Sequence, residues 1–174
     1  MLITVDSAAK HLPALKKLKL HNCTLDVLYL RNFLRAFSRL PQSISITHCE
    51  GFDWDDMIDV LVEEASLLDS LHLSRISRMR PSRPRRFDFL RHFPKLRKFQ
   101  LNGQCLAWDS LSHMGPDVSM VVLGSNTLSL TEIALNVATW DLKEGSKITL
   151  MIKGIFYDQR ERDALEVCVL MLSR

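Results

Sequence analysis

The sequence has few of the features that mark several common classes of protein. Four cysteines occur among 174 residues with no CxxC pair, which indicates free thiols in a reducing compartment. The longest apolar stretch, residues 165–172, is far shorter than the roughly 20 residues that cross a bilayer, and no secretory leader is visible. The six glycines are scattered, and no phosphate-binding loop, HExxH or GxSxG motif occurs. We therefore expect no membrane span, no cofactor, no catalytic residues and no enzyme activity, and a cytoplasmic or nuclear protein.

The net charge of the chain does not by itself exclude or indicate a class of partner. The formal net charge is +3, which is too small to indicate nucleic-acid binding without a local concentration of charge. Hydrophobic residues make up 47% of the chain, enough for a sizeable core. The length fits one domain or one repeat array.

A recurring apolar pattern is the strongest feature of the chain. Residues 15–25 read LKKLKLHNCTL and fit LxxLxLxx(N/C)xL at every fixed position. Three weaker copies follow, carried by Ile44, Ile46 and Cys49; by Leu68, Leu71, Leu73 and Ile76; and by Leu96, Phe99, Leu101 and Leu106. The equivalent positions are about 27 residues apart, within the range of leucine-rich repeats. The pattern predicts an α/β fold: a short leucine-rich-repeat solenoid with parallel strands on one face, helices on the other, and an irregular C-terminal cap.

Helices are predicted between the strands. Thr24 or Asp26 can cap a helix after the first strand, and Asp53 can cap a second helix that has acids in its first turn. A short helix through Leu90 and Phe93 can fill the same layer in the third repeat.

The repeat period fails after Leu106, and this divides the chain in two. Residues 1–106 are predicted to hold the leucine-rich repeats with an N-terminal partial repeat. Residues 107–174 are predicted to form an irregular last repeat with a strand at 118–123, a β-hairpin that joins 137–142 to 147–152, and a C-terminal capping helix over 159–172. Terminal units of a solenoid must cover an open apolar end.

The outward side chains of the predicted strands are the candidate binding residues. Alternation in a strand sends Leu18 and Leu20 into the core and their neighbours outward. The partner-binding candidates are Lys17, Lys19, His21, Ser45, Thr47, Ser70, His72, Ser74, Lys98, Gln100 and Asn102. The same face is predicted to carry Ser43, with Ala134 and Asn136 further on. This face is polar and mildly positive, which suits a peptide or a carboxylate-rich protein partner. The alternative to a binding surface is that these side chains are simply solvated strand positions with no partner.

Metal binding is not expected. His21, Cys23, His48, Cys49 and His72 lie on neighbouring predicted strands and are ligand types for zinc. The two cysteines face inward in the repeat pattern whereas His21 and His72 face outward, so they cannot converge on one ion.

Charge is segregated along the chain. Residues 50–69 hold eight acids and no Lys or Arg, whereas residues 75–98 hold ten Lys or Arg and one acid. The basic loop is carried by Arg78, Arg80, Arg83, Arg85 and Arg86, and two prolines exclude a regular helix there. Three interpretations stay open: a solvated run paired with the acidic helix, a docking site for an acidic segment or an import factor, and a nucleic-acid-binding loop.

The repeats resemble the leucine-rich portion of fungal F-box-type proteins over roughly residues 12–106. The resemblance is carried by LPALKKLKLHNC at 12–23, ISITHC at 44–49, LDSLHLSRI at 68–76 and FPKLRKFQL at 93–101. It implies a non-catalytic module that recognises substrates for a ubiquitin ligase, with a separate F-box recruiting the ligase scaffold. About a dozen residues precede the first repeat, too few for an F-box, so we expect the scaffold as a partner only if this is part of a longer chain.

Overall fold

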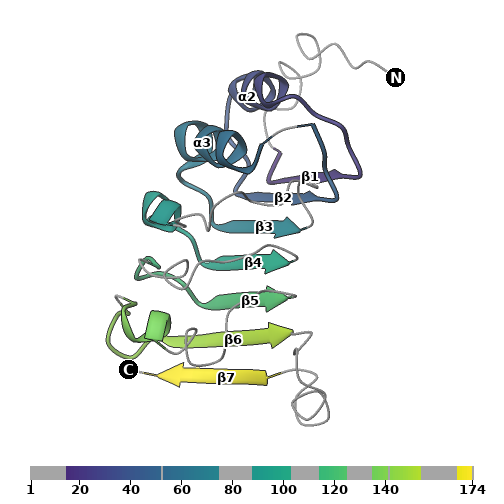
Figure 1. Ribbon diagram of the computed structural model, residues 1–174. Coiled ribbons are helices and arrows are strands. Elements are labelled where there is room, and N and C mark those ends of the chain that lie inside the picture. The colour runs from purple at the N-terminus through teal and green to yellow at the C-terminus, as the bar shows by residue number, and fades with distance from the viewer. Residues whose placement is uncertain are drawn as a thin grey trace, which may run out of the picture.

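The computed structural model describes residues 15–51, 53–74, 88–102, 114–124, 135–140, 142–153 and 168–173. Its strands stack in chain order, each hydrogen-bonded to the next (Figure 1). They are β1 (Lys17–His21), β2 (Ser43–Thr47), β3 (Ser70–Ser74), β4 (Lys98–Asn102), β5 (Met120–Gly124), β6 (Lys147–Lys153) and β7 (Cys168–Ser173). The first six are parallel, and β7 runs antiparallel to β6. The chain therefore has an α/β fold in which six parallel strands and one antiparallel strand form one sheet, with few helices in the described ranges, compatible with a solenoid.

The strands pair without offset. Leu20 is paired with Ile46, Ile46 with Leu73, and Leu73 with Leu101. The prediction that these positions are equivalent is therefore confirmed. Leu123 of β5 continues the row, although the chain between β4 and β5 is shorter than the earlier connections.

Helices occupy one side of the sheet, as the apolar spacing predicts. Three of them are α2 (Val27–Arg35), α3 (Trp54–Ala65) and the 3-10 helix η2 (Asp88–His92). Asp26 caps α2, since its Oδ1 accepts a hydrogen bond from the N–H of Leu28 at 2.7 Å. Asp53 caps α3 in the same way, with the N–H of Asp55 at 2.8 Å. Each cap satisfies a backbone donor that has no partner within the helix.

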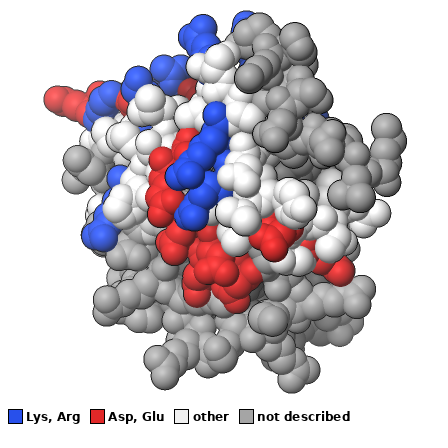
Figure 2. Space-filling model, turned by 90° about the horizontal axis from the view of Figure 1, so that it is seen from above, with Lys and Arg blue, Asp and Glu red and all other residues white. Residues whose placement is uncertain are grey.

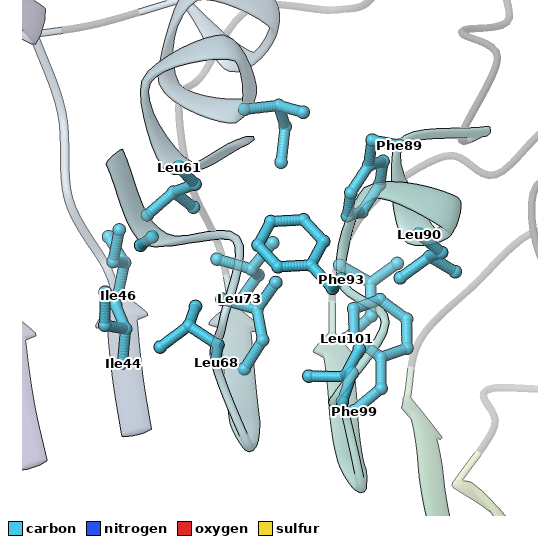
Figure 3. Close-up of a cluster of buried hydrophobic side chains, with 14 of the residues drawn as sticks. Ile44, Ile46, Leu61, Leu68, Leu73, Phe89, Leu90, Phe93, Phe99 and Leu101 are labelled. Carbon is cyan, nitrogen blue, oxygen red and sulfur yellow. The ribbon is translucent and has the colours of Figure 1, made fainter. Parts of the chain in front are cut away.

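The core lies between the helices and the inward faces of the strands. Figure 3 shows Leu61 of α3 above Ile44 and Ile46 of β2, and the aromatic rings near η2 beside β4. Phe93 is fully buried and meets Phe89 edge to face, with ring centroids 6.1 Å apart. Each repeat thus buries its apolar side chains against the next repeat, which no repeat could do alone.

Left-handed backbone marks the turns that follow the first two strands. Asn22 and His48 have φ values of 53° and 54° directly after β1 and β2. Gly51 has φ of 96°, and a Cβ at that position would lie 2.7 Å from the carbonyl oxygen of Leu25 in the preceding repeat. The close approach of two repeats therefore requires glycine there.

Two predictions for the C-terminal third are wrong. Residues 168–172, predicted to end a capping helix, lie in strand β7, because the edge of β6 offers a ladder of hydrogen bonds to an apolar segment. The predicted hairpin between 137–142 and 147–152 does not form, because residues 135–138 make a helical turn. Strand β6 is paired with β5 and β7 instead. The predicted strand at 118–123 is present as β5, and residues 159–167 lie outside the described ranges.

Candidate functional site

The outer face of the sheet, the side opposite α2 and α3, carries the side chains that alternate with the core. In β2, Ile44 and Ile46 are fully buried whereas Ser45 and Thr47 are half-exposed. Because neighbouring strands are in register, outward side chains line up in rows that cross the sheet. The outer face is thus a regular lattice of side chains on a rigid backbone.

Every residue predicted to bind a partner lies on β1 to β4 in these rows, except Asn136 and Ala134, and Ala134 lies outside the described ranges. The three rows are Lys17, Ser43, Ser70 and Lys98; Lys19, Ser45, His72 and Gln100; and His21, Thr47, Ser74 and Asn102. Ser74 is the most enclosed of them, at 8% exposure. Asn136 is buried in the helical turn 135–138, so its predicted place on this face is wrong.

Hydrogen bonds between neighbouring strands hold two imidazoles against the sheet. His21 Nδ1 and Thr47 Oγ1 are 2.8 Å apart, and Ser45 Oγ and His72 Nδ1 are 3.1 Å apart. Both pairs join residues that face each other in the parallel register. The rings are therefore held in place before any partner arrives, which lowers the entropic cost of binding.

His72 is the most perturbed group of the outer face. Burial lowers the pKa of its imidazole, and the nearby Lys19 ammonium lowers that pKa further. Neutral imidazole is therefore favoured near pH 7. Its Nε2 is buried and has no hydrogen-bond partner in the part of the chain that the structure describes.

Positive charge lies at two places on the outer face of β1 to β4. Lys17 and Lys19 are exposed on β1, and Lys98 is exposed on β4. The hydroxyl side chains of β2 and β3 lie between them, and no carboxylate stands in the rows of β1 to β4. The short polar side chains of β2 and β3 thus form a strip between two groups of ammonium side chains. This arrangement favours binding of an anionic segment of a partner.

The rows continue onto strands that the sequence analysis did not include. Met120 and Thr149 extend the first row, and Val122 and Met151 extend the second. Met120 and Met151 are half-exposed, and Val122 is 7% exposed. The outward side chains of β5 are therefore the apolar Met120 and Val122, whereas β6 presents Lys147 and Thr149 beside Met151. Residues 118–123 were visible in the sequence as a buried strand, but without the repeat period they gave no register with β4.

The two cysteines of the repeat pattern donate to the backbone. Cys23 Sγ lies 3.2 Å from the carbonyl oxygen of His21, and Cys49 Sγ lies 3.4 Å from that of Thr47. Both thiols are free, and burial raises the pKa of Cys49. Among the described residues, no group of three or more His, Cys, Asp or Glu side chains could hold a metal ion.

The acidic helix α3 is paired with α2. Arg31 lies 2.7 Å from Glu63, and Arg35 lies 2.6 Å from Glu64. Figure 2, which looks down the stack from its α2 end, shows basic side chains beside an acidic cluster. The predicted pairing of α3 with the basic loop stays a prediction, because Arg78, Arg80, Arg83, Arg85 and Arg86 lie outside the described ranges.

None of the helices in the described ranges is both long enough and apolar enough to cross a membrane. Comparisons with protein-family models, with curated proteins and with solved structures found no match for this chain.

Proposed function

We propose that this chain is a non-catalytic interaction module of the leucine-rich-repeat type, which binds a protein partner through the outer face of its sheet. The observation that carries the proposal is the unbroken register of outward side chains from β1 to β6 on the side away from the helices. Such rows present rigidly held groups at a fixed spacing, which suits recognition of an extended surface.

The chemistry of the outer face indicates the kind of partner. Lys17, Lys19 and Lys98 favour carboxylates over β1 to β4. Met120 and Met151 favour apolar side chains over β5 and β6, and methionine adapts its shape to what it contacts. Six strands span about 24 Å at roughly 4.8 Å per strand. The partner segment therefore carries carboxylates where it meets β1 and β4 and an apolar side chain where it meets Met120 and Met151, while Lys147 of β6 is a further cation beside them.

The resemblance to the repeat region of fungal F-box-type proteins supports a more specific role. In that family the repeats recognise the substrate of a ubiquitin ligase, while an F-box binds the scaffold. We extend that role to this chain as a hypothesis: the outer face selects the substrate, and the scaffold is a partner if the repeats belong to a longer chain.

The test compares affinity capture from a lysate by the native chain and by the triple variant Lys17→Glu, His72→Glu and Lys98→Glu. These side chains occupy two rows of the outer face, so their reversal should abolish capture of a partner that binds there. The matched control is Lys16→Glu, Arg91→Glu and His92→Glu, which makes the same change of charge at exposed positions away from the rows. Circular dichroism establishes that both variants are folded.

A protein captured by the native chain and by the control, but not by the triple variant, supports the proposal. Ligase scaffold components in the capture would support the F-box analogy. Equal capture by all three proteins would contradict binding through the outer face. Capture of nucleic acid that is lost in salt, and lost when Arg83, Arg85 and Arg86 are neutralised, would favour the alternative of a polyanion-binding basic loop.

A further inference from the structure

A groove lies at the ends of the strands where the chain enters β2 to β5, at the tails of the arrows in Figure 1. It has a volume of about 780 Å³. Leu40 and Leu67 form part of its lining, and they stand at the same place in successive repeats, three residues before β2 and β3. They are 37% and 60% exposed. These two leucines are exposed and do not belong to the hydrophobic core, so they are candidate contacts for a partner.

Two cations of the polar lining have no ion-pair partner among the residues that the structure describes. Asp69 is engaged by Arg97, whose Nε lies 3.4 Å from Oδ1, and Asp117 is engaged by Lys143. Arg39 and Lys95 also line the groove. Neither has a carboxylate within ion-pair distance in the described ranges. The groove thus offers two cations beside two exposed leucines.

The backbone along the groove is already satisfied. The N–H groups of Asp69 and Arg97 donate to the carbonyls of Gln42 and Asp69, at 2.9 Å and 2.8 Å. Ser119 continues this ladder by donating to Arg97 at 2.8 Å. A partner therefore cannot add a strand here by backbone pairing, and recognition must come from side chains.

The spacing of the repeats selects a helix. Equivalent side chains of stacked strands are about 4.8 Å apart. One turn of an α-helix rises about 5.4 Å, so residues three or four apart on a helix laid along the stack match successive repeats. Two apolar residues one turn apart would cover Leu40 and Leu67, and a carboxylate on the following turn would meet Lys95.

We propose that this groove binds an amphipathic helix of a protein partner, with apolar anchors over Leu40 and Leu67 and acidic side chains against Arg39 and Lys95. The site is separate from the outer face of the sheet. A second copy of this chain is a poorer fit. Its acidic helix α3 presents carboxylates, but the apolar face of that helix is buried in its own core.

The experiment selects binders from a displayed library of 14-residue helical peptides, using the full-length chain as the target. Binding of the enriched peptide is then measured by fluorescence anisotropy. We expect enriched peptides with two apolar residues one turn apart and a Glu or Asp on the next turn. Lys95→Glu should weaken binding about tenfold, and Leu67→Ala about fivefold. Both residues are exposed, so neither substitution should unfold the chain.

Changing the peptide's acids to Lys should restore its binding to the Lys95→Glu variant. The triple variant of the outer face should bind the peptide as the native chain does, which separates this groove from the proposed function. The proposal is overturned if no peptide is enriched, or if enriched peptides are basic or bind Lys95→Glu unchanged. It is also overturned if sedimentation shows a dimer of the native chain that Lys95→Glu dissociates, since the occupant would then be a second copy.

Discussion

Equivalent core positions recur along the stack, so the same substitution by Ala can be made at each of them. We expect the loss of unfolding free energy to depend on the position of the strand in the stack. Ile46, Leu73 and Leu101 are at most 1% exposed and each lies between two paired strands. Leu20 is half-exposed and belongs to β1, the first strand in the sheet order. Replacing each of the four by Ala therefore removes an equivalent core side chain. At Leu20 that side chain has a neighbouring strand on one side only, and at the other three positions it has one on both sides.

The magnitude follows from burial and from the cavity left behind. A fully buried Leu or Ile replaced by Ala costs about 3 kcal/mol of unfolding free energy, because transfer and cavity terms add. We expect about 3 kcal/mol at Ile46, Leu73 and Leu101, and about 1 kcal/mol at Leu20, where little cavity forms. For a chain of this size, 3 kcal/mol lowers the melting temperature by about 6 to 12 °C.

Urea unfolding followed by circular dichroism measures these differences. The exposed Leu67→Ala serves as the control, and we expect it to stay within about 0.5 kcal/mol of the native chain. Equal losses at Leu20 and Leu73, or a loss at Leu73 no larger than that at Leu67, would refute the argument that mid-stack positions derive their stability from repeats on both sides.

The remaining predictions concern one turn and one titratable group. Gly51→Ala should cost about 1 to 3 kcal/mol, because it adds a Cβ against the backbone at φ of 96°, whereas Gly145→Ala, with open space around it, should cost about 1 kcal/mol or less. Similar urea midpoints for the two variants would show that the close approach at Gly51 does not matter. The pKa of His72 is lowered on folding, so the unfolded chain binds more protons below its ordinary value of 6.5, and stability should fall as pH drops from about 7.5 to 5. His72→Gln should flatten this dependence, and identical pH profiles would contradict it.

The first four strands were predictable because their pattern is redundant. Each places two inward apolar residues at fixed positions, and the equivalent residues Leu20, Ile46, Leu73 and Leu101 recur at nearly constant spacing. The helix caps were also visible, since an Asp before a helical pattern satisfies a local donor whatever the tertiary structure. Most of the candidate outer face followed from the same alternation.

The continuation of the outer face onto β5 and β6 was not predictable in the same way. Met120 and Met151 join the rows only through pairing with strands that the repeat period does not locate. The groove was also missed, because Arg39, Leu40, Leu67 and Lys95 are far apart in the chain and unremarkable in its repeat pattern. Only stacking of the repeats brings them to one surface.

What the sequence by itself determined is local or periodic: the in-register strands β1 to β4, the capped helices and the polar rows. What only the tertiary structure decided is the C-terminal end of the stack. The apolar residues 168–172 fit a helix face and a buried strand equally well, since a short apolar run suits both periods. These residues form strand β7, because the otherwise unpaired edge of β6 gains a complete hydrogen-bond ladder only from another strand.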